Sequence, residues 1–258
     1  MTEQAGYVRV ERTAPGVSTI TFFHPAHNAM PSHLLARLAA AIQQTGEDAG
    51  VQIIVLKSGG ERTFCAGASF DELLAIKDEA SGEAFFSGFA DVINACRQCP
   101  KLIIGRVQGK AISGGVGLAA ASDYCFATKY ASVKLSELAI GIGPFVVGPV
   151  IERKIGLAAF SHLTLSPKTF ADPDWAKSKG LYNEVFDSAE AMDEAIAAKA
   201  EQLAAYNPAA LKAMKAAFWS GTEHWDTLLT ERAKTSGRLV LSAFTREALE
   251  AFKSGMRK

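Results

Sequence analysis

Glycine residues and one carboxylate in the middle of the chain are the residues best suited to chemistry. A strand predicted over Leu102–Val107 runs into a glycine-rich turn, and a helix of small residues is expected over about Val116–Ser122. Such a turn leaves backbone N–H groups free at the start of the helix, where they can hold a developing oxyanion. A second strand, Tyr124–Ala127, and a short extended segment then lead to Glu137. N–H donors beside one carboxylate suit proton transfer next to a carbonyl group.

A second turn of small residues, Ala66–Ser69, also follows an extended segment and precedes a predicted helix. Ser69 is expected to cap that helix, with Glu72 completing a capping box. Two such turns facing each other would offer two N–H donors to one oxygen atom. A thioester carbonyl needs this arrangement when its α-carbon is deprotonated, and loss of one donor typically costs about 3–4 kcal/mol of transition-state stabilisation.

The same glycines fit a second interpretation. The run Gly115–Ala120 matches G-x-G-x-x-A, and Glu137 lies twenty residues beyond Gly117, close to a dinucleotide-binding fingerprint. Against this, the motif lies in the middle of the chain rather than in a first β-α-β unit, and it leaves the turn at Ala66–Ser69 without a role. A nicotinamide enzyme stays open as an alternative, and close helix–strand packing explains the glycines structurally.

Composition argues against several classes of protein. The 258 residues include 27 Lys+Arg and 27 Asp+Glu, a formal net charge of zero, so no nucleic-acid partner is expected. No run approaches about 18 apolar residues, which argues against a membrane protein. The N-terminus has no apolar signal region, and we expect a soluble, cytoplasmic protein. The cysteines form no metal pattern and are expected to be buried thiols in a reducing compartment: Cys65, Cys96, Cys99 and Cys125.

The order of the predicted elements indicates an α/β fold with helices packed outside sheets. The chain opens with a hairpin, Tyr7–Arg12 and Val17–Phe23. It continues with a helix over Leu34–Gln44 capped by Ser32, a buried strand over Val51–Lys57, helices over Glu83–Gln98, Leu157–Leu165 and Asp174–Lys179, and a strand over Leu181–Phe186. The remainder is helical, over Ala189–Ala205, Pro208–Phe218, His224–Leu241 and Ala243–Phe252. Apolar stripes on these last helices suggest either self-association or fold-back onto the core.

In combination, these motifs resemble the crotonase superfamily of enoyl-CoA hydratases and isomerases. The resemblance covers nearly the whole chain, through HNAM, FCAGAS with DEL, QGKAISGGVGLAAASDYCFAT, SELAIGIGP, GLYNEV and EALEAFKSGMRK. It implies a spiral of ββα units over residues 1–190 and an all-helical region over residues 191–258, which would serve trimerisation or cover the CoA. It also implies an acyl-CoA thioester substrate and a homotrimer or dimer of trimers. Coenzyme A would be part of the substrate, and no metal or redox cofactor is implied.

Matching positions imply roles for individual residues. Ala68 and Gly114 would supply the two oxyanion N–H groups, and Glu137 would move the proton. The residues expected to contact the CoA or the acyl group are Ala26, His27, Ala66, Phe145, Phe252 and Lys253. The last two belong to a basic C-terminal end that, in the family, often reaches a neighbouring subunit.

The chain departs from the family pattern at three places. Family hydratases carry a second glutamate where this chain has Gly117, an Asp is usual at Ser69, and the usual PGAGG reads PFVVG over Pro144–Gly148. The third departure puts Phe145 and two valines near the acyl pocket. Because one carboxylate suffices to move a proton between the α- and γ-carbons, the loss of the first acid favours double-bond isomerisation. Alternatives are a methylglutaconyl-CoA-type hydratase of fatty or branched-chain acid catabolism, a hydratase-lyase on aromatic thioesters, and a non-catalytic acyl-CoA-binding subunit.

Two carboxylates have simpler interpretations as well. Without the resemblance, Glu137 is equally consistent with a solvated or helix-capping group. As an acid–base group it should have its pKa raised by burial. The neighbours expected to bury it are Leu138, Ile140, Ile142 and Phe145. Asp123, at the end of the small-residue helix, is expected to make a structural hydrogen bond.

Overall fold

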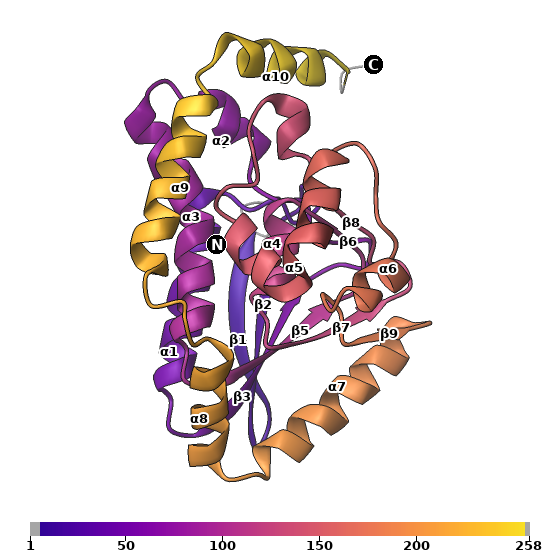
Figure 1. The fold of residues 1–258 in the computed structure, drawn as a ribbon. Helices are drawn as coiled ribbons and strands as arrows, with labels where there is room; N and C mark the ends of the chain where they lie inside the picture. Colours follow the sequence, from indigo (N-terminus) through magenta and orange to yellow (C-terminus); the bar gives the residue numbers. More distant parts are fainter. Residues whose placement is uncertain (1–5, 256–258) are drawn as a thin grey trace.

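Two β-sheets form the centre of the protein in a computed structural model, which describes residues 6–255 and the side chains of residues 6–251. The larger sheet has the strand order β1-β2-β3-β5-β7-β9 and the smaller has the order β4-β6-β8 (Figure 1). The β1–β2 hairpin is antiparallel, and the other neighbouring strands run parallel. The strands are β1 (Tyr7–Ala14), β2 (Gly16–Phe23), β3 (Val51–Ser58), β4 (Thr63–Cys65), β5 (Leu102–Val107), β6 (Lys110–Ile112), β7 (Tyr124–Thr128), β8 (Val133–Lys134) and β9 (Glu184–Phe186).

The chain alternates between the two sheets as it winds. β3 belongs to the large sheet and β4 to the small one, and the same holds for β5 and β6 and for β7 and β8. Each pair leads into helical structure: α2 (Phe70–Ala75) and α3 (Glu79–Gln98) after the first, α4 (Gly114–Ala120) after the second, and the 3-10 helix η2 (Glu137–Ile140) with α5 (Gly148–Leu165) after the third. This repeat is the predicted spiral of ββα units, and the predicted α/β class is confirmed.

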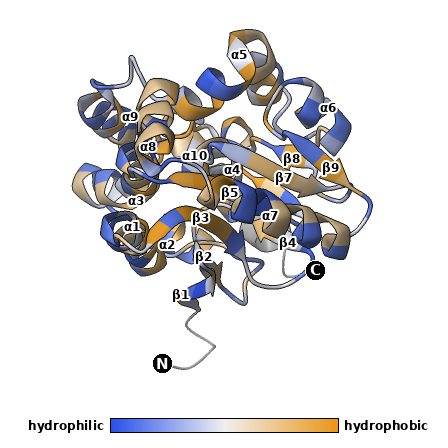
Figure 2. Ribbon diagram, turned by 90° about the horizontal axis from the view of Figure 1, so that it is seen from below, coloured by the Kyte–Doolittle hydropathy of each residue, from blue (hydrophilic) through white to orange (hydrophobic). Residues whose placement is uncertain are grey.

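The middle strands of the large sheet are apolar on both faces because both faces are covered. In β3, Ile54 and Leu56 belong to the main core, whereas Ile53 and Val55 pack in a second cluster beneath α7 (Ala189–Ala204). Figure 2 shows the hydrophobic colour of these central strands. The uninterrupted apolar run predicted as a buried strand is therefore explained.

The starts of two helices differ from the prediction. α1 (Ser32–Glu47) begins at Ser32 itself, and the residue before it, Pro31, holds the N-cap position. Among the described residues, no side-chain hydrogen bond caps α1, and the Ser32 hydroxyl donates to Oε2 of Glu72 at 2.6 Å. Ser69 does cap α2, accepting from the N–H of Glu72 at 3.4 Å. Because the Glu72 carboxylate is bonded to Ser32 instead, the predicted reciprocal half of the capping box is wrong.

Two other helices are longer than predicted. α3 begins at Glu79 because Asp78 and Ser81 form a capping box ahead of the predicted start. α5 begins at Gly148 and is kinked at Gly156, whose φ is 77°. The predicted helix over Leu157–Leu165 is therefore the second half of a longer element. α6 (Pro173–Ser178) and the strand after it lie close to their predicted places.

The last helices fold back on their own chain. α8 (Pro208–Phe218) is followed by α9 (Trp225–Leu239), which packs along α3 where Gly82 and Gly237 bring the two backbones together. α10 (Ala243–Gly255) lies against η2. Of the apolar side chains predicted to serve self-association or fold-back, Leu203 and Leu211 pack on the second hydrophobic cluster of their own chain, whereas Met214 and Phe218 on α8 are exposed.

The predicted division of the chain at residues 190 and 191 falls inside α7. The buried face of α7 carries Met192, Ile196 and Ala200, which pack on the large sheet. How the chain divides into domains stays a prediction. Within residues 6–255, no helix is long and apolar enough to cross a membrane.

Candidate active site

Three turns meet at one edge of the small sheet. β4, β6 and β8 are parallel neighbours, so their carboxyl ends point the same way, with about 5 Å between adjacent strands. Ala68 comes three residues after β4, Gly114 two residues after β6, and Glu137 three residues after β8. The topology therefore brings together the turns that carry the three residues predicted to act in catalysis.

The first two turns touch each other. A Cβ atom built on Gly67 would lie 3.3 Å from Cβ of Ser113 and 3.6 Å from the backbone nitrogen of Gly114. A Cβ atom on Gly115 would collide with the carbonyl oxygen of Cys65. The two turns of small residues face each other, as expected, and glycine is what permits the contact.

The N–H groups of Ala68 and Gly114 are the candidate oxyanion donors. The turn around Ala68 is fixed on both sides, since the N–H of Met30 donates to Gly67 O at 2.8 Å and the N–H of Ser69 donates to Met30 O at 3.1 Å. The N–H of Ala68, and that of Gly114 at the first position of α4, donate to no acceptor within the described part of the chain. Two unused donors on touching turns are what the predicted oxyanion site requires, and that role stays a prediction.

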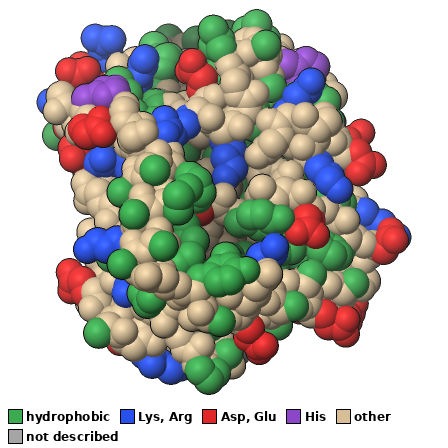
Figure 3. Space-filling model, turned by 60° about the horizontal axis from the view of Figure 1, so that its bottom comes forward, with side chains coloured by type: hydrophobic (Ala, Val, Ile, Leu, Met, Phe, Trp, Pro, Cys, Tyr) green, Lys and Arg blue, Asp and Glu red, His purple; other side chains and the backbone are tan. Residues whose placement is uncertain are grey.

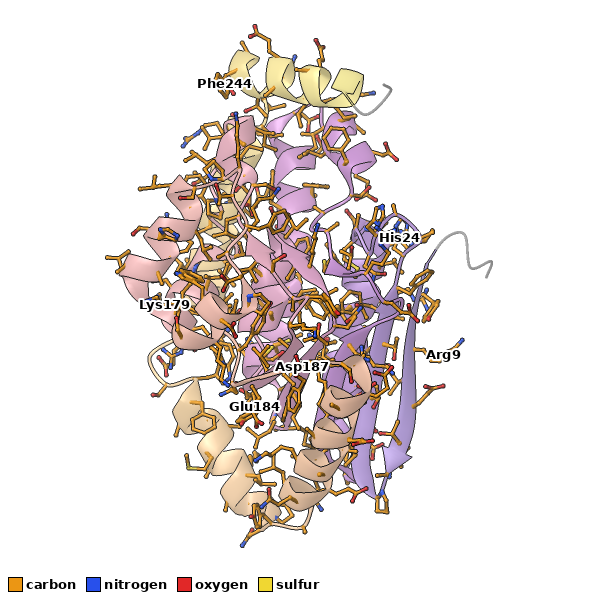
Figure 4. All side chains as sticks on the ribbon, turned by 90° about the vertical axis from the view of Figure 1, so that its right-hand side faces the viewer. Arg9, His24, Lys179, Glu184, Asp187 and Phe244 are labelled. Carbon is orange, nitrogen blue, oxygen red and sulfur yellow. The ribbon has the colours of Figure 1, made fainter. Side chains whose placement is uncertain are left out.

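Asn28 anchors the loop before α1 to the segment between β3 and β4, a role that the sequence did not reveal. Its Nδ2 donates to the carbonyl oxygens of Gly59 and Thr63, both at 2.8 Å, and its Oδ1 accepts from the N–H of His24 at 2.9 Å. Figure 4 shows His24 in this loop. Asn28 has a φ of 56°, a conformation that Asn tolerates better than most residues. An Asn between two prolines was the available signal.

The residues predicted to contact CoA lie in or beside these segments as far as they are described. Ala26 and His27 are exposed in the loop that Asn28 anchors, and Ala66 is half-buried in the first turn. The backbone of Phe252 and Lys253 belongs to α10, but their side chains lie outside the described residues. Their contacts with CoA stay predictions.

Glu137 opens η2, and its carboxyl group is buried. Burial raises the pKa of Glu137 from 4.5 to about 7, against the opposing effect of hydrogen bonds from its own backbone, the Ser113 side chain and the Ser136 backbone. Oε2 of Glu137 is buried and has no hydrogen-bond partner within residues 6–255. A carboxyl group that changes charge near neutral pH and has a free oxygen is suited to general acid–base chemistry.

The apolar surroundings of η2 differ in part from those predicted. Leu138 is 42% exposed, so its predicted place around the carboxyl group is wrong, because the 3-10 turn directs it to solvent. Ile142 is buried, and Ile140 packs with it in a cluster that includes residues of α2 and α3. Gly141, with φ 79°, lies against Phe244 at the start of α10, which Figure 4 labels. The helix α10 therefore covers the segment that carries Glu137 in its own chain.

Val147 fills the space beside Gly117, where the family pattern has its other glutamate. A Cβ atom on Gly117 would lie 2.6 Å from Cγ1 of Val147 and 2.9 Å from its Cβ. The ring of Phe145 is half-buried and packs over Gly143 in its own loop. Two of the departures from the family pattern are thus coupled, since the missing side chain at 117 and the valine at 147 occupy one volume.

Asp123 makes structural contacts, as predicted. Its oxygens accept from Lys215 Nζ at 2.7 and 2.9 Å, from Trp219 Nε1 at 2.8 Å, and from the N–H of Ile103 at 2.7 Å. The cysteines are buried free thiols, also as predicted.

The glycine pattern does not fit a dinucleotide site. Gly115 and Gly117 both lie within α4, whereas a dinucleotide fingerprint needs its glycines in the turn between strand and helix. The strand before them, β6, is three residues long and belongs to the small sheet.

Known proteins share both the sequence and the fold. Residues 12–256 match the enoyl-CoA hydratase/isomerase family. The chain is 30% identical over 200 residues to a mitochondrial methylglutaconyl-CoA hydratase from Mus musculus, covering 76% of this chain and 63% of that protein. It is 28% identical over 222 residues to a peroxisomal Delta(3,5)-Delta(2,4)-dienoyl-CoA isomerase from Arabidopsis thaliana, covering 80% and 78%.

A crystal structure of an enoyl-CoA hydratase from Bacillus halodurans has the same fold, with a TM-score of 0.88 at 20% identity and coverage of 95% of this chain and 99% of that one. The family match spans nearly all of the chain that the structure describes, including the three turns. The chain therefore belongs to the enoyl-CoA hydratase/isomerase family of the crotonase superfamily, whose members are enzymes that act on acyl-CoA thioesters.

Proposed function

We propose that the protein shifts the double bond of an enoyl-CoA thioester from the β,γ to the α,β position. The proposal is carried by one observation: Val147 fills the space beside Gly117, which leaves Glu137 as the carboxyl group at the three turns. Hydration is easiest with one carboxylate to hold the water and another to complete the proton relay. A 1,3-proton shift needs a single group that first removes a proton and then returns one.

The proposed reaction begins when the Glu137 carboxylate removes a proton from the α-carbon of a β,γ-enoyl thioester. The electron pair moves onto the thioester oxygen, which accepts hydrogen bonds from the N–H groups of Ala68 and Gly114. Neutral Glu137 then returns the proton to the γ-carbon, and the double bond forms in conjugation with the thioester. No water is consumed. A pKa of about 7 lets Glu137 serve as base and then as acid near neutral pH.

The remaining parts of the substrate are assigned by the same reasoning. The exposed loop at Ala26 and His27, with the turn at Ala66, would receive the CoA portion, and Phe145 would border the acyl group. Phe252 and Lys253, at the end of α10, would lie over the CoA. The CoA belongs to the substrate in this proposal, and the protein's own residues supply the acid–base group.

A homo-oligomer is supported by exposed hydrophobic side chains. Leu157 and Leu165 on α5 are 64% and 72% exposed, and Met214 and Phe218 on α8 are 48% and 49% exposed. Figure 3 shows hydrophobic side chains gathered around a hollow on the lower side of the molecule. Apolar surface of this kind marks interfaces. We propose a trimer or a dimer of trimers; a cytoplasmic location stays a prediction.

Hydration is the second candidate, favoured by the identity to the mouse methylglutaconyl-CoA hydratase. In that reaction Glu137 alone would hold and activate the water. The product would be a 3-hydroxyacyl thioester, and the protein would serve fatty or branched-chain acid catabolism.

The test is NMR of a 3-enoyl-CoA and of crotonyl-CoA in D2O, with the wild-type protein and Glu137→Gln. We expect the wild type to move the double bond of the 3-enoyl-CoA with deuterium uptake and to form no 3-hydroxyacyl product. Glu137→Gln should lower the rate at least about 1,000-fold, within the range for loss of a general acid–base group.

The other outcomes decide between the alternatives. A 3-hydroxyacyl thioester from crotonyl-CoA would replace the isomerase by the hydratase. CoA binding without any α-proton exchange, over a wider panel of thioesters that includes aromatic ones, would favour the non-catalytic subunit and contradict both enzymatic proposals.

A further inference from the structure

Ser113 ties the second turn to the third, the turn that carries Glu137. Its N–H donates to the carbonyl oxygen of Lys134 at 2.8 Å, and its own carbonyl accepts from the N–H groups of Val116 at 2.9 Å and Gly117 at 3.3 Å. Its hydroxyl lies 2.8 Å from the hydroxyl of Ser136, the residue before Glu137. Ser113 thus joins the start of α4 to the end of β8.

The backbone of Ser113 has a conformation that favours glycine. Its φ is 53° and its ψ is −114°, which a residue with a Cβ atom adopts only with strain. Glycine follows at 114, 115 and 117, yet this position is a serine. Strained residues of this kind concentrate at functional sites, where the side chain has a task that glycine cannot perform.

Capping α4 is not that task. Ser113 holds the N-cap position, but its hydroxyl makes no capping hydrogen bond. The hydroxyl instead lies 2.8 Å from the hydroxyl of Ser136 and accepts from the N–H of Ser136 at 3.3 Å, so it fixes the residue that precedes Glu137. It also favours the charged form of Glu137, against the effect of burial on the pKa of that carboxyl group.

We propose that Ser113 is a positioning residue that, through its contacts with Ser136, holds the segment carrying Glu137 beside the oxyanion turn, with Oε2 of Glu137 left free for the substrate. Its neighbour Gly114 carries one candidate oxyanion N–H, so a single strained residue sets the relation between proton acceptor and oxygen site. This inference rests on the proposed role of Glu137 in proton transfer, and it holds equally for isomerisation and hydration.

Charged neighbours do not compete with this effect. The elements packed against η2 are α5, which carries Glu152 and Arg153 near its start, and α10, which carries Arg246, Glu247 and Glu250. Ile140 of η2 also packs in a cluster with α2, which carries Asp71 and Glu72, and with α3, which carries Glu79 and Glu83 near its start. Lys134 precedes Glu137 on β8. Within the described chain, no charged group is among the causes of the raised pKa of Glu137, which reflects burial opposed by backbone N–H groups and Ser113. Removal of the Ser113 hydroxyl should therefore be visible directly in the titration of Glu137.

The experiment compares Ser113→Ala with Ser113→Gly. Both variants lack the hydroxyl, but only alanine keeps the strained Cβ atom. Turnover of the enoyl-CoA substrate at pH 7 should fall roughly 10- to 100-fold in both, as expected for loss of a hydrogen bond to a charged group, with KM nearly unchanged. The lower pH limit of kcat/KM should move up by about one unit in both. Thermal unfolding should differ, with Ser113→Gly melting about 2–4 °C above Ser113→Ala.

Ser136→Ala and Ser122→Ala complete the set. Ser136→Ala removes the hydroxyl that contacts Ser113 but keeps the N–H that donates to it, and should give a smaller shift of the same sign. Ser122 has a buried hydroxyl at the other end of α4 that donates to Leu118 O at 3.4 Å, so its removal should leave the titration of Glu137 unchanged.

A second readout does not depend on turnover. The carboxyl carbon of Glu137 is titrated by NMR in ¹³C-glutamate-labelled protein, with Glu137→Gln to assign the signal. An unchanged midpoint in both Ser113 variants would overturn the inference, as would a loss of activity in Ser113→Ala that glycine restores. A shifted midpoint in a protein that turns over no thioester would instead contradict the proposed function and leave the role of Ser113 intact.

Discussion

Two buried carboxyl groups in this fold differ in how far their oxygens are satisfied. Asp123, just after α4, accepts hydrogen bonds from Lys215, Trp219 and the backbone of Ile103. Glu137 lies on a segment that Ser113 fixes through Ser136, and its Oε2 has no partner within the described chain. Asp123 lies directly before β7, and Glu137 lies three residues after β8.

The contrast separates a structural group from a group available for chemistry. Every donor around Asp123 is a fixed protein group, so the site leaves no position for a substrate atom. A buried oxygen without a hydrogen-bond partner is costly and rare in native proteins. Its presence at Glu137 is explained if the substrate supplies the missing partner when it binds. Burial alone therefore does not distinguish the two carboxyl groups, whereas the free oxygen does.

The largest expected effect comes from disrupting the hydrogen bonds and the ion pair of Asp123. Asp123→Asn should lower the free energy of unfolding by about 3–5 kcal/mol, because the ammonium group of Lys215 would remain buried without its counter-charge. Glu137→Gln should change it by less than about 1.5 kcal/mol at pH 5, since the amide resembles the neutral acid. Urea unfolding followed by circular dichroism measures both. Activity per folded molecule should survive in Asp123→Asn, and equal destabilisation of the two variants would contradict the contrast.

The candidate catalytic residues were easier to predict from the sequence than the residues that surround them. Ala68, Gly114 and Glu137 were proposed because each lies in a short turn with a local signal, and because the surrounding motifs resemble one family. The partners that define the environment of Glu137 come from elsewhere in the chain. Ser113 reaches it only because β6 pairs with β8, and that pairing leaves no local signal in the sequence.

Local rules failed where a distant residue competed. Ser32 fits an N-cap by type, but Pro31 takes that position, and both the N–H and the hydroxyl of Ser32 donate to the distant Glu72 carboxylate. Leu138 was expected to surround Glu137, and the 3-10 turn directs it to solvent instead. In the sequence, Gly117 and Val147 belong to two separate departures from the family pattern. The structure shows that they are coupled, because Val147 packs into the space beside Gly117.

A smaller effect follows from the pH dependence of stability. The folded-state pKa of Glu137 is raised from 4.5 to about 7, so between these values the folded protein keeps a proton that the unfolded chain has lost. The contribution of Glu137 to the free energy of unfolding is therefore most favourable below about pH 4.5 and declines as the pH rises through 7.

Wild type and Glu137→Gln should consequently diverge with pH. We expect the wild type to lose about 2–3 kcal/mol relative to Glu137→Gln between pH 5 and pH 8. Urea unfolding at several pH values measures this difference. Glu61→Gln, at an exposed position after β3, is the matched control and should show no such divergence. Parallel curves for wild type and Glu137→Gln would mean that the carboxyl group is not held in a buried site.

The smallest expected effect concerns Gly117, the position at which family hydratases carry their second glutamate. Gly117→Ala puts a Cβ atom 2.6 Å from Cγ1 of Val147 and should destabilise the protein by about 1–3 kcal/mol through overpacking. Glycine in a helix is otherwise weaker than alanine, so Gly117→Ala in a Val147→Ala background should become neutral or stabilising. Whether Gly117→Ala stabilises or destabilises the protein thus depends on the residue at position 147. A double-mutant cycle by urea unfolding measures the coupling. Additive effects would show that Val147 does not fill this space, and the single-carboxylate reasoning behind isomerisation would lose its structural basis.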